Sequence, residues 1–104
     1  MTTDRELLEL AAKAVGYRIC HFVSDTRAYV SDDLRDIRFY WQPGDDDGDN
    51  RRLQVKLKVG LVPVEDGGWA CVTWDHDDEV TLAVDIDPNF AVVRAAAEIG
   101  RQMK

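Results

Sequence analysis

The residues with the clearest potential for chemistry are the aspartates of the segment QPGDDDGDNRRL. Asp45, Asp47 and Asp49 have the alternate spacing with which a calcium-binding EF-hand loop begins. The sixth position of such a loop needs glycine and is Asn50 here, and the twelfth needs a bidentate glutamate and is Lys56. We therefore expect no metal in this segment and interpret it as an acidic turn that leads into a further element.

Two cysteines and two histidines offer ligands for zinc or partners for a nucleophilic pair. Neighbouring residues on a strand point to opposite faces, so Cys20 and His21 cannot both face one metal, and Cys71 and His76 diverge in the same way. A nucleophilic Cys71 would need the sheet to bring one of these histidines to it. The chain also has no nucleophile elbow, phosphate-binding loop or dinucleotide fingerprint. We expect reduced thiols, and a protein that is not an enzyme and uses no cofactor or metal.

Two acidic clusters, each next to a tryptophan, are the best candidates for a binding surface. Aromatic anchors with a charged rim are typical of protein interfaces, although acidic turns and strand tryptophans also serve purely structural purposes. The candidate partner-binding residues are Trp41, Asp45, Asp46, Asp47 and Asp49, which form the first acidic cluster, and Trp74, Asp75, Asp77, Asp78 and Glu79, which form the second acidic cluster.

The charge of the chain bears on which partner such clusters would meet. With 20 acidic and 13 basic residues, the formal net charge is −7, which disfavours direct binding to nucleic acid and favours a basic protein partner. The chain opens with Asp4, Arg5 and Glu6, unlike a secretory signal, and no window reaches the roughly 20 apolar residues of a membrane span. We expect a cytoplasmic protein without membrane contact.

Helix signals mark both ends of the chain. The spacing of Thr3 from the following glutamate, the apolar periodicity, and Gly16 at the end predict a helix over Asp4–Val15. Asp87 as N-cap and Pro88 at the first helical position predict a final helix.

Between these helices, short runs rich in β-branched and aromatic residues alternate with polar turns. The predicted strands are Tyr17–Val23, Arg27–Val30, Ile37–Gln42, Leu61–Glu65, Trp69–Trp74 and Val80–Ile86. In the last of them, Val80, Leu82, Val84 and Ile86 are predicted to share the buried face. The order of elements predicts an α+β fold: an antiparallel sheet of five to six strands with two or three helices packed on one face. Residues 1–104 are expected to form a single compact domain, because 45% hydrophobic content in this length supports one core.

The segment after the first acidic cluster carries conflicting signals. Apolar residues occupy every second position from Leu53 to Val59, which is the spacing of a strand. Asp49 stands ahead of the segment like an N-cap and Gly60 follows it like a C-cap, which favours a helix. The pattern by itself leaves both structures open.

Three blocks of the chain resemble those of small uncharacterised proteins of bacteriophages and prophages. They are TDRELLELAAKAVGY at the start, YWQPGDDDGDNRRLQVKL in the middle and VVRAAAEIG near the end. In such proteins the acidic block is similar to the beginning of a helix, so the resemblance implies a helix over about Asp49–Val59. The family has no assigned activity, catalytic residue or cofactor to carry over.

The resemblance also implies a function class. Small acidic phage proteins commonly bind and block a host component, including defence complexes whose basic channels hold nucleic acid, as anti-CRISPR inhibitors do. Our leading hypothesis is such non-catalytic binding to a host protein with a basic surface. The alternatives are a structural or regulatory homodimer, and a module that binds a small ligand such as a nucleotide signal between sheet and helices. In that module the phosphate would be taken by Arg51, Arg52 or Arg38.

Overall fold

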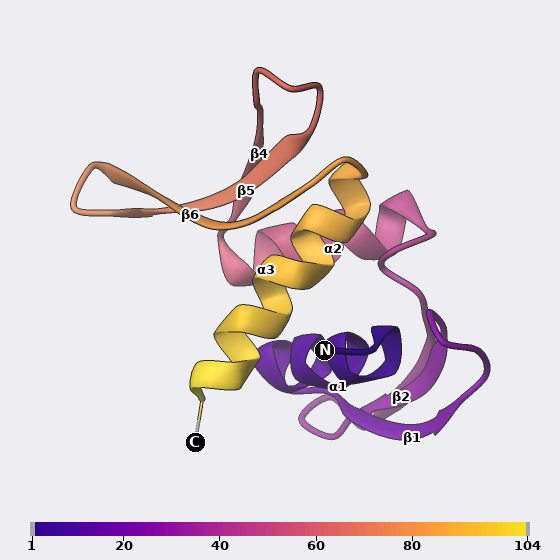
Figure 1. Cartoon of the computed structure of the whole chain (residues 1–104). Helices are drawn as coiled ribbons and strands as arrows, with labels where there is room; N and C mark the ends of the chain where they lie inside the picture. Colours follow the sequence, from indigo (N-terminus) through magenta and orange to yellow (C-terminus); the bar gives the residue numbers. More distant parts are fainter. Residues whose placement is uncertain (1, 104) are drawn as a thin grey trace.

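The computed structural model describes residues 2–103, and in that range the chain forms three helices and six strands (Figure 1). In chain order the elements are α1 (Asp4–Val15), β1 (Arg18–Phe22), β2 (Ala28–Asp32), β3 (Ile37–Trp41), α2 (Asp47–Leu57), β4 (Gly60–Pro63), β5 (Trp69–Asp75), β6 (Asp78–Asp85) and α3 (Pro88–Gln102). The α+β class is confirmed. No helix within the described range is long and apolar enough to cross a membrane.

The six strands form two antiparallel sheets, β1-β2-β3 and β4-β5-β6, instead of the single sheet that we predicted. Helix α3 explains the separation, because it is buried on more than one side and contacts α1, α2 and the β4-β5-β6 sheet. In Figure 1 it runs between that sheet and α1, while α1 packs against the other sheet. Two sheets that each cover a different part of the helical layer cannot join at their edges.

Helices α1 and α3 approach each other closely at Gly100. A Cβ atom at this position would collide with the backbone carbonyl of Leu10, so no other residue fits without moving the helices. The surrounding helix faces carry small buried residues, namely Ala11, Ala12, Ala96 and Ala97. The close packing of these helices therefore depends on the small side chains of the alanines and on the absence of a side chain at Gly100.

Both predicted ends of α1 and the predicted start of α3 are confirmed. The Thr3 hydroxyl accepts a hydrogen bond from the Glu6 backbone N–H at 3.2 Å, and Gly16 ends α1 in the left-handed conformation with φ 82°. The carboxylate of Asp87 accepts from the backbone N–H groups of Asn89 and Phe90 at the start of α3.

Helix α2 is confirmed as a helix but begins and ends two residues earlier than predicted. Its N-cap is Asp46, not Asp49, and its C-cap is Lys58 in the left-handed conformation with φ 58°. Gly60 belongs to β4, where the Trp74 ring lies so close that a Cβ on Gly60 would sit 3.1 Å from its Cη2 atom. A side chain at Gly60 would press against this ring, and the chain ends the helix with lysine.

The predicted buried face of the last strand is wrong at Val80, which is 41% exposed, and again beyond the middle of the strand, while Leu82 is partly buried. Cys71 pairs with Ala83 and the next residue of β5 pairs with Thr81, so Leu82 is an extra, bulged residue in β6. A bulge changes the side to which the following side chains point. Consequently Val84 is 53% exposed, and Ile86, which follows the strand, is 80% exposed.

The β1-β2-β3 sheet has one buried and one open face. Ala28, Val30 and Trp41 belong to the core on the side of α1. The opposite face carries a row of rings in which His21 stacks on Tyr29 and Tyr29 contacts Tyr40 at 5.0 Å between ring centroids. Such cross-strand pairs stabilise a sheet and leave this face partly exposed.

Candidate functional site

The first acidic cluster lies at the start of α2, where two of its carboxylates hold the backbone. Asp46 accepts a hydrogen bond from the Gly48 N–H at 3.1 Å, as an N-cap does. Asp49, whose side chain is 8% exposed, accepts from the Gln42 backbone N–H at 3.0 Å and from the Arg52 guanidinium at 2.6 Å. These bonds fix the turn between β3 and α2 from both sides.

The other members of the first acidic cluster also have partners inside the fold. Asp45 accepts a hydrogen bond of 2.8 Å from the Thr26 hydroxyl, and Asp47 accepts one of 2.8 Å from the Asn89 side-chain amide. Trp41 is only 3% exposed and belongs to the core. Trp41 and Asp49 are therefore both buried within the fold and offer little surface to a partner.

The second acidic cluster surrounds the two-residue turn between β5 and β6, at the end of a hairpin that projects away from the helices (Figure 1). Asp75, Asp77, Asp78 and Glu79 are exposed, and none of them accepts a side-chain hydrogen bond from residues 2–103. Trp74, which precedes the turn, is 55% exposed. This hairpin tip therefore presents four carboxylates and an aromatic ring that the fold does not use for hydrogen bonding.

The tip also has an unusual backbone. His76 and Asp77 form the turn with φ values of 50° and 74°, a left-handed pair that closes a tight hairpin. The His76 ring is 3.5 Å from Asp75 and almost fully exposed. The carboxylates are thus held close together on a short, defined turn.

The cysteines and histidines are not brought together. Cys71 is completely buried in β5, and burial raises its pKa to about 11, so it is a neutral thiol at pH 7. His76 lies at the hairpin tip and His21 on the open face of the other sheet. Both cysteines are free thiols, and Cys20 is exposed. In the part of the chain that the structure describes, no group of three histidine, cysteine or acidic side chains is placed to hold a metal ion.

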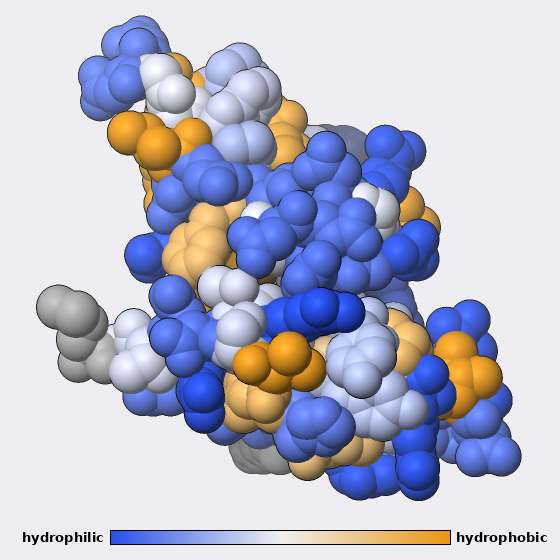
Figure 2. Space-filling model, turned by 90° about the vertical axis from the view of Figure 1, so that its right-hand side faces the viewer, coloured by the Kyte–Doolittle hydropathy of each residue, from blue (hydrophilic) through white to orange (hydrophobic). Residues whose placement is uncertain are grey.

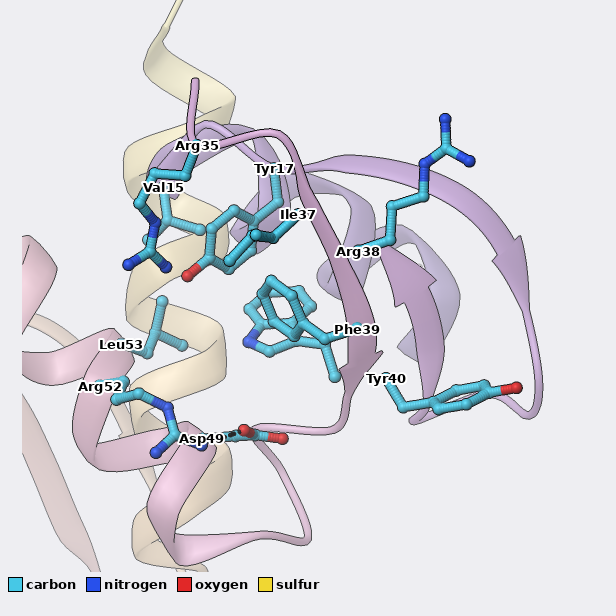
Figure 3. A pocket seen from close by; sticks show the side chains of 11 residues that line it. Val15, Tyr17, Arg35, Ile37, Arg38, Phe39, Tyr40, Asp49, Arg52 and Leu53 are labelled. Carbon is cyan, nitrogen blue, oxygen red and sulfur yellow. Dashed lines mark hydrogen bonds and ion pairs between the residues drawn. The ribbon is translucent and has the colours of Figure 1, made fainter. Parts of the chain in front are cut away.

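A pocket of about 360 Å³ lies between the end of α1, β3 and α2 (Figure 3). Tyr17 meets Phe39 edge to face, with ring centroids 5.2 Å apart, and meets Trp41 in the same way at 5.5 Å. Further apolar side chains complete the lining, namely Val15, Ile37 and Leu53. The pocket is therefore largely aromatic and apolar.

Two arginines stand at one side of this pocket. The guanidinium groups of Arg35 and Arg52 lie on the side toward which the Tyr17 hydroxyl points (Figure 3). Arg35 donates to Asp32 at 2.9 Å, and this hydrogen bond is the main reason why the pKa of the Asp32 carboxyl is below its ordinary value. Burial, followed by the charge of Asp32, raises the pKa of Tyr17, so its hydroxyl keeps its proton and can donate.

The pocket agrees only partly with the arginines that we predicted for a phosphate. Arg52 and Arg38 both belong to its lining, although the guanidinium group of Arg38 extends away from the other lining side chains (Figure 3), and Arg51 is not in the lining. Tyr17 and Arg35 were not predicted. Arg35 follows Asp32 by three residues in a turn, which is a weak signal that such an arginine is held in place.

Comparison of the chain with protein-family models, with curated proteins and with solved structures gives no match. The fold and these surfaces define a small acidic α+β protein with an acidic hairpin tip and a separate aromatic pocket. The face that carries the start of α2 is mostly hydrophilic, with small separate hydrophobic groups (Figure 2).

Proposed function

We propose that this protein acts by non-catalytic binding to a protein with a basic surface, and that the β5–β6 hairpin makes the contact. The observation that carries the proposal is the difference between the two acidic clusters. The carboxylates of the first acidic cluster all accept hydrogen bonds within the fold, whereas those of the second acidic cluster accept no side-chain hydrogen bond from the described residues. Surface charge without a structural role is available to attract a partner.

The hairpin is well suited to such a contact. Backbone pairing from Trp69 to Asp75 holds the tip in one conformation, so little ordering entropy is lost when it binds. Trp74 adds an exposed aromatic ring beside the carboxylates, and tryptophan is one of the residue types enriched among the residues that contribute most to binding in protein interfaces. The charged tip would steer the encounter, and the ring would slow dissociation.

The class of partner follows from charge and shape. A narrow acidic hairpin resembles a nucleic-acid strand in charge, so a basic channel that holds nucleic acid would also accept it. Because the chain resembles phage proteins, we propose that the partner is a bacterial host protein with such a basic channel. The two proteins would meet in the cytoplasm of the host cell. On this proposal the protein is an accessory inhibitor of the anti-defence kind.

The test compares two variants that remove the same charge from two different hairpins. Asp77→Asn/Asp78→Asn neutralises the tip, and Glu65→Gln/Asp66→Asn neutralises two exposed acids in the β4–β5 turn. Host proteins captured by each variant and by wild type are identified and quantified by mass spectrometry. We expect a basic protein that the tip variant captures at least about tenfold less well, while the control captures it normally. Equal capture by the tip variant, equal loss in both variants, or no basic protein among those captured would contradict the proposal.

A further inference from the structure

We propose that the pocket between β3 and α2 binds a small ligand that combines a flat aromatic ring with one anionic group, a phosphate or a carboxylate. The proposal concerns a different surface from the β5–β6 hairpin, and its tests use different residues. Its evidence is the shape of the pocket, the aromatic lining, and the placement of two arginines on one side.

The lining explains the aromatic part of the ligand. A volume of about 360 Å³ lies within the range of known small-molecule sites, and the residues around it are mainly aromatic and aliphatic. Tyr17 and Phe39 are only partly buried, so their rings are accessible from the pocket. Each already packs edge to face inside the protein, and a flat ring of a ligand can extend this arrangement.

The arginines explain the anionic part. Arg35 donates its Nε–H to Asp32, and Arg52 donates one terminal N–H to Asp49, while both carboxylates are nearly buried. A guanidinium group has five N–H donors, so each arginine keeps further donors for a ligand. The buried carboxylates act as fixed anchors, which reduces the conformational freedom that the arginines would lose on binding. The Tyr17 hydroxyl on the same side supplies a further donor, which is neutral.

The local charge also favours an anion. Arg35, Arg52 and Lys56, whose Nζ lies 4.7 Å from the centroid of the Tyr17 ring, outnumber the carboxylates of Asp32 and Asp49. The chain as a whole carries a net charge of −7. A small anion would therefore be attracted to this region, whereas the net charge of the protein as a whole would repel it.

The first experiment identifies the ligand class by thermal shift and isothermal titration calorimetry on the full chain. The probes are the four nucleoside monophosphates, the matching nucleosides, inorganic phosphate, and 2-naphthoate as an aromatic carboxylate. We expect at least one nucleotide or 2-naphthoate to bind and to raise the melting temperature, and to bind at least tenfold more tightly than nucleoside or phosphate alone. Binding by nucleotides assigns the anion as phosphate, and binding by 2-naphthoate alone assigns it as carboxylate. Nucleosides or phosphate that bind equally well, or no binding by any probe, would overturn the proposal.

The second experiment assigns the site with a neighbouring control. Arg52→Gln is expected to lower the affinity for the probe at least tenfold. Arg51→Gln, on the same helix but outside the pocket lining, should leave this affinity unchanged. Because Arg52→Gln also removes the partner of Asp49, Arg52→Lys and Tyr17→Phe are measured as milder variants. Both variants should fold and should lower the affinity for the probe severalfold. Arg52→Lys loses the planar guanidinium group, and Tyr17→Phe loses a single hydroxyl. Equal effects of the changes at Arg51 and Arg52, or unchanged affinity in all pocket variants, would contradict the assignment.

Discussion

Aspartates from similar acidic runs of this chain lie in different structural environments. Whether an aspartate is buried or exposed depends on the hydrogen-bond donors around it. Asp49 is buried because the Gln42 N–H and the Arg52 guanidinium replace the water that it loses. Asp78, at the exposed hairpin tip, has no such donors among residues 2–103. Acidic composition alone therefore does not distinguish a structural carboxylate from one that is available for binding.

This difference predicts unequal effects on stability. Asp49→Ala leaves the Gln42 N–H and the Arg52 guanidinium without their acceptor, so we expect the free energy of unfolding to fall by about 2–3 kcal/mol. Asp78→Ala should change it by less than about 0.5 kcal/mol, as an ordinary surface substitution does. Urea denaturation of the two variants measures both values, and similar losses in the two would show that Asp49 has no special structural role.

The pair of Arg35 and Asp32 predicts a dependence on pH. The hydrogen bond from Arg35 lowers the pKa of Asp32 from its ordinary 3.8, so folding favours the ionised form. The stabilisation is therefore fully present above pH 3.8 and is lost as the pH falls through the lowered pKa. We expect Arg35→Gln to raise the pKa of Asp32 toward 3.8, and the stability difference from wild type to vanish in acid. An NMR titration of Asp32 that is identical in both proteins would refute this.

At the scale of elements, the residues that end the helices differ in how easily they adopt the left-handed backbone conformation. Gly16 and Lys58 both end a helix in the left-handed conformation, at φ 82° and 58°, but only glycine adopts it without a steric cost. We expect Lys58→Gly to raise the free energy of unfolding by about 1 kcal/mol and Gly16→Ala to lower it by about 1 kcal/mol. Thermal and urea denaturation compare them, and a Lys58→Gly variant less stable than wild type would mean that the lysine side chain has another role.

The same scale shows what the sequence can and cannot predict. Both ends of α1 and the start of α3 were predictable because Thr3, Gly16 and Asp87 act through bonds to residues close in the chain. The bulge at Leu82 was not, because it depends on how β6 pairs with β5. The contribution of Tyr17 and Arg35 to the pocket was missed for a related reason, because only the folded chain brings these residues into one lining with Arg52.

At the scale of the whole molecule, the number of strands was predictable and their grouping was not. Local alternation identifies each strand but does not say which strands pair, and α3 separates the two groups through contacts distant in sequence. The consequence for function is that the β4-β5-β6 sheet is free to extend a hairpin away from the helices (Figure 1). The acidic tip is thus a product of the tertiary arrangement as well as of its residues.

The central claim is that this tip binds a basic partner through its charge. The most direct measurement is the dissociation constant with the purified partner, determined by calorimetry between about 50 and about 300 mM salt. We predict that wild type loses affinity steeply with salt, and that Asp77→Asn/Asp78→Asn binds more weakly and with a clearly smaller salt dependence. The Glu65→Gln/Asp66→Asn control should follow wild type. A salt-independent affinity, or the same salt dependence in wild type and in the tip variant, would contradict the claim.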